Sequence, residues 1–194
     1  MLKTRINNLA RFTIVIGLLL LMSACGQSAT IKTNDGNIEV SSSGNEVKLT
    51  TDKGASTVMS EGDDGSVSME TTDENGKSQS TQFSESKELP KDFPESVPLP
   101  DGANVTGSIK NIVDGAESFI ITFDVEMTSD ELHKLYADYL KKEGFTDVFD
   151  MAQSDVLMLS GKLDSTSFSI TASQNTEDNS RFDAVLTWTE EAGK

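Results

Sequence analysis

The stretch SFIITFDVEMTSDELHKLYADYLKKEGF, residues 118–145, decides the fold of the C-terminal half of the chain. In its first ten residues every second position is apolar: Phe119, Ile121, Phe123, Val125 and Met127. The positions between them are mostly polar, with Ile120 as the exception. Because successive side chains of a strand point to opposite faces, this period of two predicts a half-buried β-strand.

The second part of the stretch changes to a helical period. Thr128 followed by Glu131 has the pattern of a capping box, in which each side chain binds the other residue's backbone N–H. The apolar residues that follow fall on one face of a helix: Leu132, Leu135, Tyr136, Tyr139 and Leu140. Lys141 and Lys142 suit the negative end of the helix dipole, and Gly144 suits the left-handed residue after a helix. The sequence therefore predicts a helix over 129–143.

Alternating stretches on both sides predict more strands. Residues 104–113 form a strand that an Asp114-Gly115 turn joins to the next one as a hairpin. After the helix, strands are expected at 145–151, 155–163, 166–173 and 181–190. The order β-β-α-β-β-β-β predicts an α+β domain over 101–194, an antiparallel sheet with one amphipathic helix on one face. Trp188 is in phase with Phe182 and Leu186, which favours core packing over an exposed binding platform.

A proline-rich lead-in, residues 89–100, precedes this domain. It holds all four prolines of the chain, Pro90, Pro94, Pro98 and Pro100. Because proline fixes its own φ and drives the preceding residue towards extended backbone, the segment is neither a helix nor a central strand. Its regularly placed apolar residues are expected to pack against the following domain: Leu89, Phe93, Val97 and Leu99.

Residues 25–88 form an acidic segment rich in Ser, Thr and Gly. Turn sequences such as Asn34-Asp35-Gly36 and Asp73-Glu74-Asn75-Gly76 recur along it, with short alternating stretches between them. Asx-Gly turns between such stretches are typical of hairpins. Each stretch offers only about two apolar side chains, which bury little surface against the entropy of ordering the backbone. Two readings remain open, a thin β-hairpin ladder and a flexible tether.

Residues 1–24 have the features of a signal peptide. A basic start (Lys3, Arg5, Arg11) precedes an apolar run over 12–22, too short to span a bilayer, and then the small residues Ser23 and Ala24. Met22-Ser23-Ala24-Cys25 resembles the lipobox of bacterial prolipoproteins. The resemblance implies transfer of diacylglycerol to the Cys25 sulfur and cleavage between Ala24 and Cys25. It thus implies a lipid anchor, palmitate included, on the extracytoplasmic face of the cell membrane.

The C-terminal part resembles a loose group of small, uncharacterised bacterial envelope proteins. The residues that carry the resemblance are ELPKDFPESVPLPDGA, residues 88–103, and the helix ELHKLYADYLKKEGF, residues 131–145. The resemblance implies a fold and an envelope setting, and it brings no catalytic residues.

Charge and cysteine content limit the classes of function. The chain has 16 basic and 32 acidic residues; without the three basic residues of the signal peptide, 13 and 32 leave a formal charge of −19. Such a surface repels nucleic acid, so no nucleic-acid partner is expected. Cys25 is the only cysteine, and the lipid takes its sulfur, so the mature protein has no disulfide. The fold must rest on a hydrophobic core.

Patterns for catalysis and metal binding are weak in this sequence. The only histidine, His133, lies off the apolar stripe of the helix and is expected on the surface. One histidine and no free cysteine argue against zinc, and acidic turns such as Asp63-Asp64-Gly65 lack the spacing of a calcium loop. No cofactor is predicted. The sequence favours a non-catalytic binding module with an envelope protein as its partner. The alternatives are a hydrolase that cleaves wall polymers through carboxylates and, less favoured, a small-ligand carrier.

Overall fold

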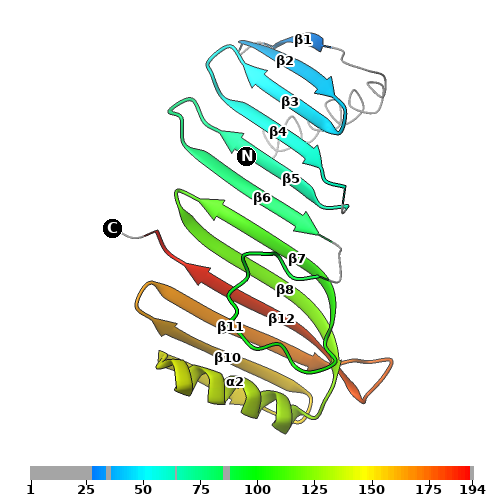
Figure 1. Cartoon of the computed structure of the whole chain (residues 1–194), viewed down its shortest axis with the longest axis vertical. Coiled ribbons are helices and arrows are strands. Elements are labelled where there is room, and N and C mark those ends of the chain that lie inside the picture. The colour runs from blue at the N-terminus through cyan, green and yellow to red at the C-terminus, as the bar shows by residue number, and fades with distance from the viewer. Residues whose placement is uncertain (1–27, 34–35, 64, 85–87, 193–194) are drawn as a thin grey trace, which may run out of the picture.

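The protein is built on one continuous antiparallel sheet of 12 strands (Figure 1). The computed structural model describes residues 28–33, 36–63, 65–84 and 88–192. The strand order is β1-β2-β3-β4-β5-β6-β7-β8-β12-β11-β10-β9. The chain therefore adds strands in sequence up to β8, and its last four strands return in reverse order from the far edge.

The α+β class predicted from the sequence is wrong, because strands take up 59% of the chain and the helix 9%. The protein is mainly β. The cause is a pairing that local patterns do not show: β6 (Ser78–Ser84) pairs with β7 (Asn104–Val113) from Gln79↔Val113 to Ser84↔Ser108. The sheet thus continues through six further strands, and one helix is too small to form a layer over it.

The elements predicted for the C-terminal half agree closely with those of the structure. Asp114 and Gly115 both have positive φ, as the tight turn of a two-residue hairpin requires. The elements in chain order are β7, β8 (Ala116–Glu126), α2 (Ser129–Glu143), β9 (Thr146–Ala152), β10 (Val156–Leu163), β11 (Thr166–Gln174) and β12 (Arg181–Glu190).

The predicted caps of α2 are confirmed. Thr128 Oγ1 accepts a hydrogen bond from the Glu131 backbone N–H, and the Glu131 carboxylate accepts one from the Thr128 backbone N–H. The Thr128 hydroxyl also donates to the Glu131 carboxylate at 2.7 Å, and this bond, together with the one from the Thr128 backbone N–H, holds the pKa of the Glu131 carboxyl below its usual range. At the other end Gly144 has φ 84°, and its N–H donates to the carbonyls of Leu140 and Lys141. Glycine has no Cβ and adopts a positive φ without strain, so it often ends helices in this way.

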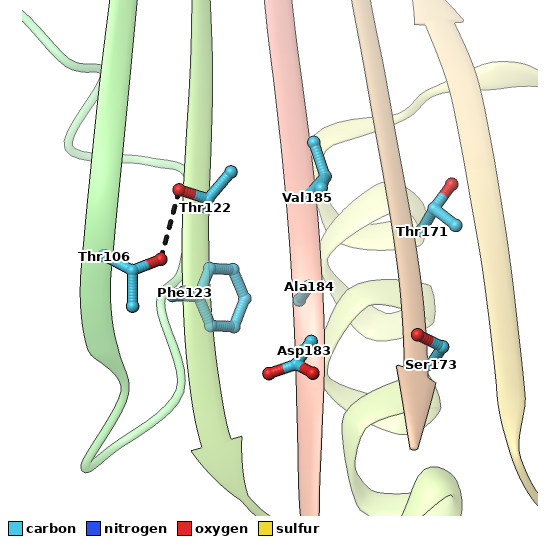
Figure 2. A pocket seen from close by; sticks show the side chains of 8 residues that line it. All are labelled: Thr106, Thr122, Phe123, Thr171, Ser173, Asp183, Ala184 and Val185. Carbon is cyan, nitrogen blue, oxygen red and sulfur yellow. Dashed lines mark hydrogen bonds between the residues drawn. The ribbon is translucent and has the colours of Figure 1, made fainter. Parts of the chain in front are cut away.

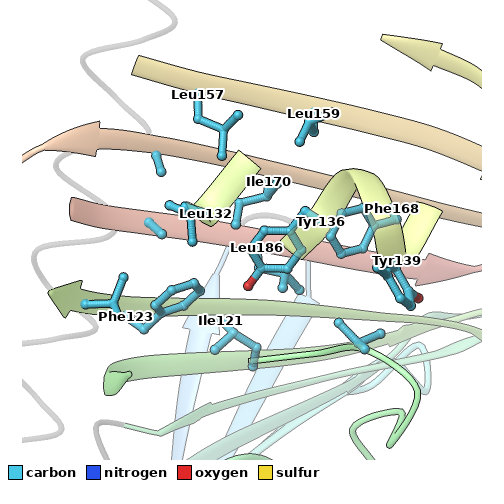
Figure 3. Packing of buried hydrophobic residues seen from close by; sticks show 14 of the residues in the cluster. Ile121, Phe123, Leu132, Tyr136, Tyr139, Leu157, Leu159, Phe168, Ile170 and Leu186 are labelled. Carbon is cyan, nitrogen blue, oxygen red and sulfur yellow. The ribbon is translucent and has the colours of Figure 1, made fainter. Parts of the chain in front are cut away.

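One face of the C-terminal half of the sheet carries the core, and α2 and the lead-in cover it (Figure 3). Four aromatic rings meet under the helix, with Phe168 of β11 in contact with Tyr136, Tyr139 and Phe145. Phe93 of the lead-in packs edge-on against Phe119 at 5.7 Å between ring centroids. The predicted docking of the lead-in is confirmed: Phe93 and Val97 are buried, and Leu89 and Leu99 pack against the core. Trp188 also packs there, as predicted, with its ring 5.9 Å from that of Phe119.

The acidic segment has six strands in the structure, so its described residues form the ladder and not the tether. They are β1 (Ser28–Thr33), β2 (Gly36–Ser43), β3 (Glu46–Thr51), β4 (Ser56–Glu61), β5 (Val67–Thr72) and β6. The turns lie at the Asx-Gly sequences, and Asp73 accepts hydrogen bonds from the N–H groups of Asn75 and Lys77. Val40 is the only buried apolar side chain in these six strands as described, so backbone pairing carries most of the ladder's order.

Tyr136 provides a test of the core. Its side chain is fully buried, and its hydroxyl finds no hydrogen-bond partner among the described residues. A buried polar group without a partner costs roughly 1–3 kcal/mol. Tyr136→Phe should therefore raise the free energy of unfolding at neutral pH by about 1 kcal/mol. Denaturant unfolding of the two proteins measures the difference, and a loss of stability in the variant would show that the hydroxyl is in fact satisfied.

The same hydroxyl predicts a pH dependence. Burial raises the pKa of Tyr136 well above its usual range, so the folded protein keeps a proton that the unfolded chain loses above about pH 10. Below pH 10 the Tyr136 hydroxyl makes its full contribution to the free energy of unfolding. Above pH 10 this contribution falls by about 1.4 kcal/mol per pH unit. Tyr136→Phe should flatten the alkaline part of the stability curve. Parallel curves for both proteins between pH 9 and 12 would contradict this.

Candidate functional site

The site residues predicted from the sequence, Met22, Ser23, Ala24 and Cys25, lie outside the described residues. The first described strand, β1, begins at Ser28, three residues after Cys25 in the sequence. Three residues of extended chain span at most about 10 Å. β1 is an edge strand of the sheet.

The face of the sheet opposite α2 and the lead-in is called the open face below. Cross-strand partners place every second residue of each strand on it; Phe83, for example, pairs with Val67 on β5 and with Ile109 on β7. Exposed apolar side chains follow this face from β5 to the far edge: Val67, Met69, Phe83, Val113, Val185, Met158 and Phe149. Phe83 is 45% exposed and Val67 43%, which is unusual for adjacent large apolar residues. No described residue packs as a second layer on these side chains.

A shallow depression of about 330 Å³ lies on the open face over β7, β8, β12 and β11 (Figure 2). Threonine and serine hydroxyls line it, and Thr106 Oγ1 donates to Thr122 Oγ1 at 3.2 Å. Asp183 is its only ionisable lining residue, and its carboxylate accepts a hydrogen bond from Asn175 Nδ2 at 2.9 Å. Ser173 is the cross-strand partner of Asp183, but no hydrogen bond joins its hydroxyl to that carboxylate in the structure, so the lining shows no activated nucleophile.

Two carboxylates face each other at one end of the depression. Asp124 of β8 and Asp183 of β12 are direct cross-strand partners, a position where like charges repel. Arg181 forms a close ion pair with Asp124, and Asn104 Nδ2 donates to the same carboxylate at 2.7 Å. These bonds offset the repulsion and tie β7, β8 and β12 together. Sequence reasoning did not find this pair, because the chain is acidic throughout and only the register brings these two residues together.

His133 lies on the surface as predicted, with its side chain 31% exposed, and it forms a pair that the sequence did not predict. Its Nε2 lies 2.9 Å from Asp150 Oδ1, so it joins α2 to the edge strand β9. A histidine next to a carboxylate also occurs in Ser-His-Asp sites. Here the serine one helical turn earlier, Ser129, donates its hydroxyl to the Gln153 carbonyl at 2.7 Å and is not directed at the imidazole by any hydrogen bond in the structure. The pair of His133 and Asp150 therefore has a structural role, since it links α2 to β9.

Lys110 fastens the lead-in to the sheet. Its ammonium lies 2.8 Å from the Asp92 carboxylate and 3.5 Å from that of Glu117, and it stands 5.3 Å from the centre of the Phe119 ring. The hydrogen bond to Asp92 raises the pKa of Lys110, and the same bond lowers the pKa of Asp92. The lysine is thus a structural cation at the margin of the core.

The described residues contain no group of three or more His, Cys, Asp or Glu side chains placed to hold a metal ion. They also contain no helix long and apolar enough to cross a membrane. The acidic turn at Asp63 and Gly65 is in the described part, whereas Asp64 lies outside it.

No protein-family model, curated protein or solved structure matches this chain. Its function has to be inferred from its own residues. Two features stand out for that purpose: the N-terminal sequence up to Cys25, and an open sheet face that presents apolar side chains.

Proposed function

We propose that the protein is a bacterial lipoprotein, anchored by lipid on Cys25 to the extracytoplasmic face of the cell membrane, and that it acts as a non-catalytic interaction module. The observation that carries the anchor is the sequence up to Cys25: a basic start, a short apolar run, two small residues and the only cysteine. Two acyl chains on one thioether give stable attachment, which a single chain does not.

The fold supports the same proposal. The sheet has β1, the first strand after Cys25 in the sequence, at one edge and β9 at the other edge, with 12 strands in all. At about 4.8 Å between strands, β9 and α2 lie roughly 50 Å from the β1 edge. Strands β1–β6 then act as a spacer that holds the core of β7–β12 away from the lipid headgroups. The chain is strongly acidic, so these strands do not bind the anionic lipid headgroups even when they stand close to them.

An interaction role is supported by what the described residues bring together. The large exposed apolar side chains lie on a sheet face, where they offer contact area. Several ionisable groups around the core are engaged in structural pairs, as with Asp124 and Arg181 or His133 and Asp150. A carboxylate held by an arginine is a poor general base, so the hydrolase alternative gains no specific support from these pairs.

The anchor is tested by substitution of the cysteine. In cells grown with radiolabelled palmitate, the wild-type protein should incorporate label, and Cys25→Ala should lose all of it because the acceptor sulfur is gone. Met22→Leu is the matched control: it keeps an apolar residue three positions before the cysteine and should be labelled like the wild type. Mass spectrometry of the N-terminal peptide should find Cys25 as the first residue. An unlabelled wild-type protein, or label that persists in Cys25→Ala, would disprove the anchor.

A further inference from the structure

We propose that the open face of β3–β8 packs against the same face of a second copy of this chain, with a two-fold axis that runs across the strands. The proposal rests on the lipid-anchored interaction module proposed above and names its partner. Its starting point is the exposure of Val67, Met69 and Phe83 on neighbouring strands, where no described residue covers them. A sheet with an apolar face is normally one of two packed layers.

The distribution of charge favours a second copy as the occupant. On the described open face of β1–β7, Glu61 at the end of β4 is the only charged residue; the charged residues of these strands otherwise point to the opposite face, including Lys48, Glu70 and Lys110. A mature chain of formal charge −19 repels other copies wherever its charged surface meets theirs. On β8 the same face also carries Asp124, which Arg181 neutralises, and Glu126 at the end of the strand, so the open face is the surface on which two copies meet with the least repulsion.

The area is sufficient for a stable dimer. Six strands about 4.8 Å apart and six residues long, at about 3.4 Å per residue, cover roughly 600 Å² per copy in projection. Two copies therefore bury about 1,200 Å² or more, which is within the range of specific protein–protein interfaces. Two antiparallel sheets pack face to face about 10 Å apart, a distance that the methionine, valine and phenylalanine side chains of this face can fill.

The symmetry agrees with anchorage in one membrane. A two-fold axis that lies between the sheets and runs from β1 to β9 reverses the strands but leaves both β1 edges at the same end. Both Cys25 residues then reach the same bilayer. Confinement to one membrane surface also raises the effective concentration of each copy for the other. Because the axis crosses the strands near their midpoints, Met69 in the middle of β5 lies close to it.

The test uses the full-length chain in its membrane and an introduced cysteine. The lipid occupies Cys25, so the new cysteine is the only free thiol. Met69→Cys and Phe83→Cys place it on the open face; Gln82→Cys, next to Phe83 on the opposite face, is the matched control. A bismaleimide with a spacer of about 10 Å should shift the first two proteins to twice the monomer mass on a gel and leave Gln82→Cys at the monomer mass. In addition, Phe83→Glu should halve the mass of the detergent-extracted wild-type dimer in sedimentation.

Each other outcome overturns the proposal. Monomeric Met69→Cys and Phe83→Cys whose thiols react freely with a monofunctional maleimide would show an uncovered face. Cross-links to a different protein would show another partner, and thiols that react only with a lipid-borne reagent would show a face that lies on the bilayer. Failure of the anchor itself is distinguishable, because unlipidated Cys25 would make the chain without any introduced cysteine react with maleimide.

Discussion

Phe168→Ala should lower the free energy of unfolding by about 3–5 kcal/mol. Phe168 is 1% exposed, and its ring lies 5.7 Å from that of Tyr136, 5.1 Å from that of Tyr139 and 6.2 Å from that of Phe145. It therefore joins the middle and C-terminal part of α2 to strand β11 of the sheet. Its removal leaves a cavity that three other rings cannot close without leaving their own positions, and it also removes their edge and stacking contacts.

The control for this prediction is a phenylalanine of the same chain in the opposite situation. Phe149 of β9 is 54% exposed on the open face, so Phe149→Ala should change the free energy of unfolding by less than about 0.5 kcal/mol. Chemical denaturation of the three proteins at micromolar concentration gives both values. Equal losses for the two variants would mean that α2 and the sheet do not form the core described here.

Gly161→Val should destabilise the protein by about 3 kcal/mol through overpacking. Gly161 lies on β10 beneath the C-terminal turn of α2. A Cβ at this position would stand 3.1 Å from Phe145 Cβ and 3.4 Å from Leu140 Cδ2, closer than ordinary contact. Valine adds two further methyl groups in the same space. The helix would have to lift from the sheet or Phe145 would have to leave the core.

The neighbouring residue gives the control. Ser160 points to the open face, where it pairs with Phe149 and Ser169, and a strand accepts valine there readily. Ser160→Val should leave thermal unfolding within about two degrees of the wild type, whereas Gly161→Val should lower the midpoint by about 6–12 degrees in a protein of this size. A Gly161→Val protein with the same unfolding midpoint as the wild type would contradict the close approach of α2 to β10.

The sequence allowed accurate prediction where the signal is local. The alternation of Phe119, Ile121 and Phe123 and the capping box at Thr128 and Glu131 each involve residues a few positions apart. Such contacts exist as soon as the element forms. For that reason the bounds of α2 agree with the predicted 129–143 and the strands on both sides agree within a few residues.

Prediction failed where the structure depends on pairing between distant residues. β6 contains a single large apolar residue, Phe83, and its bonds to β7 are backbone hydrogen bonds that any sequence can form. The continuation of the sheet, and with it the mainly β class, therefore had no local signal. The contact of His133 with Asp150 likewise depends on the register of β9, which a bulge near Asp147 shifts against β10.

The spacer role and the proposed dimer both depend on β1–β6 as an ordered part of the sheet, and hydrogen–deuterium exchange on the membrane-extracted full-length protein tests this directly. If the sheet continues from β7 to β1, the amides of β4 and β5, in the middle of the ladder, should exchange many times more slowly than those of an unfolded peptide of the same sequence. The exposed turn at Gly44 and Asn45 should exchange fast in the same experiment. Amides of β4 and β5 that exchange as fast as this turn would show that the segment is a flexible tether, and would contradict the continuous 12-stranded sheet.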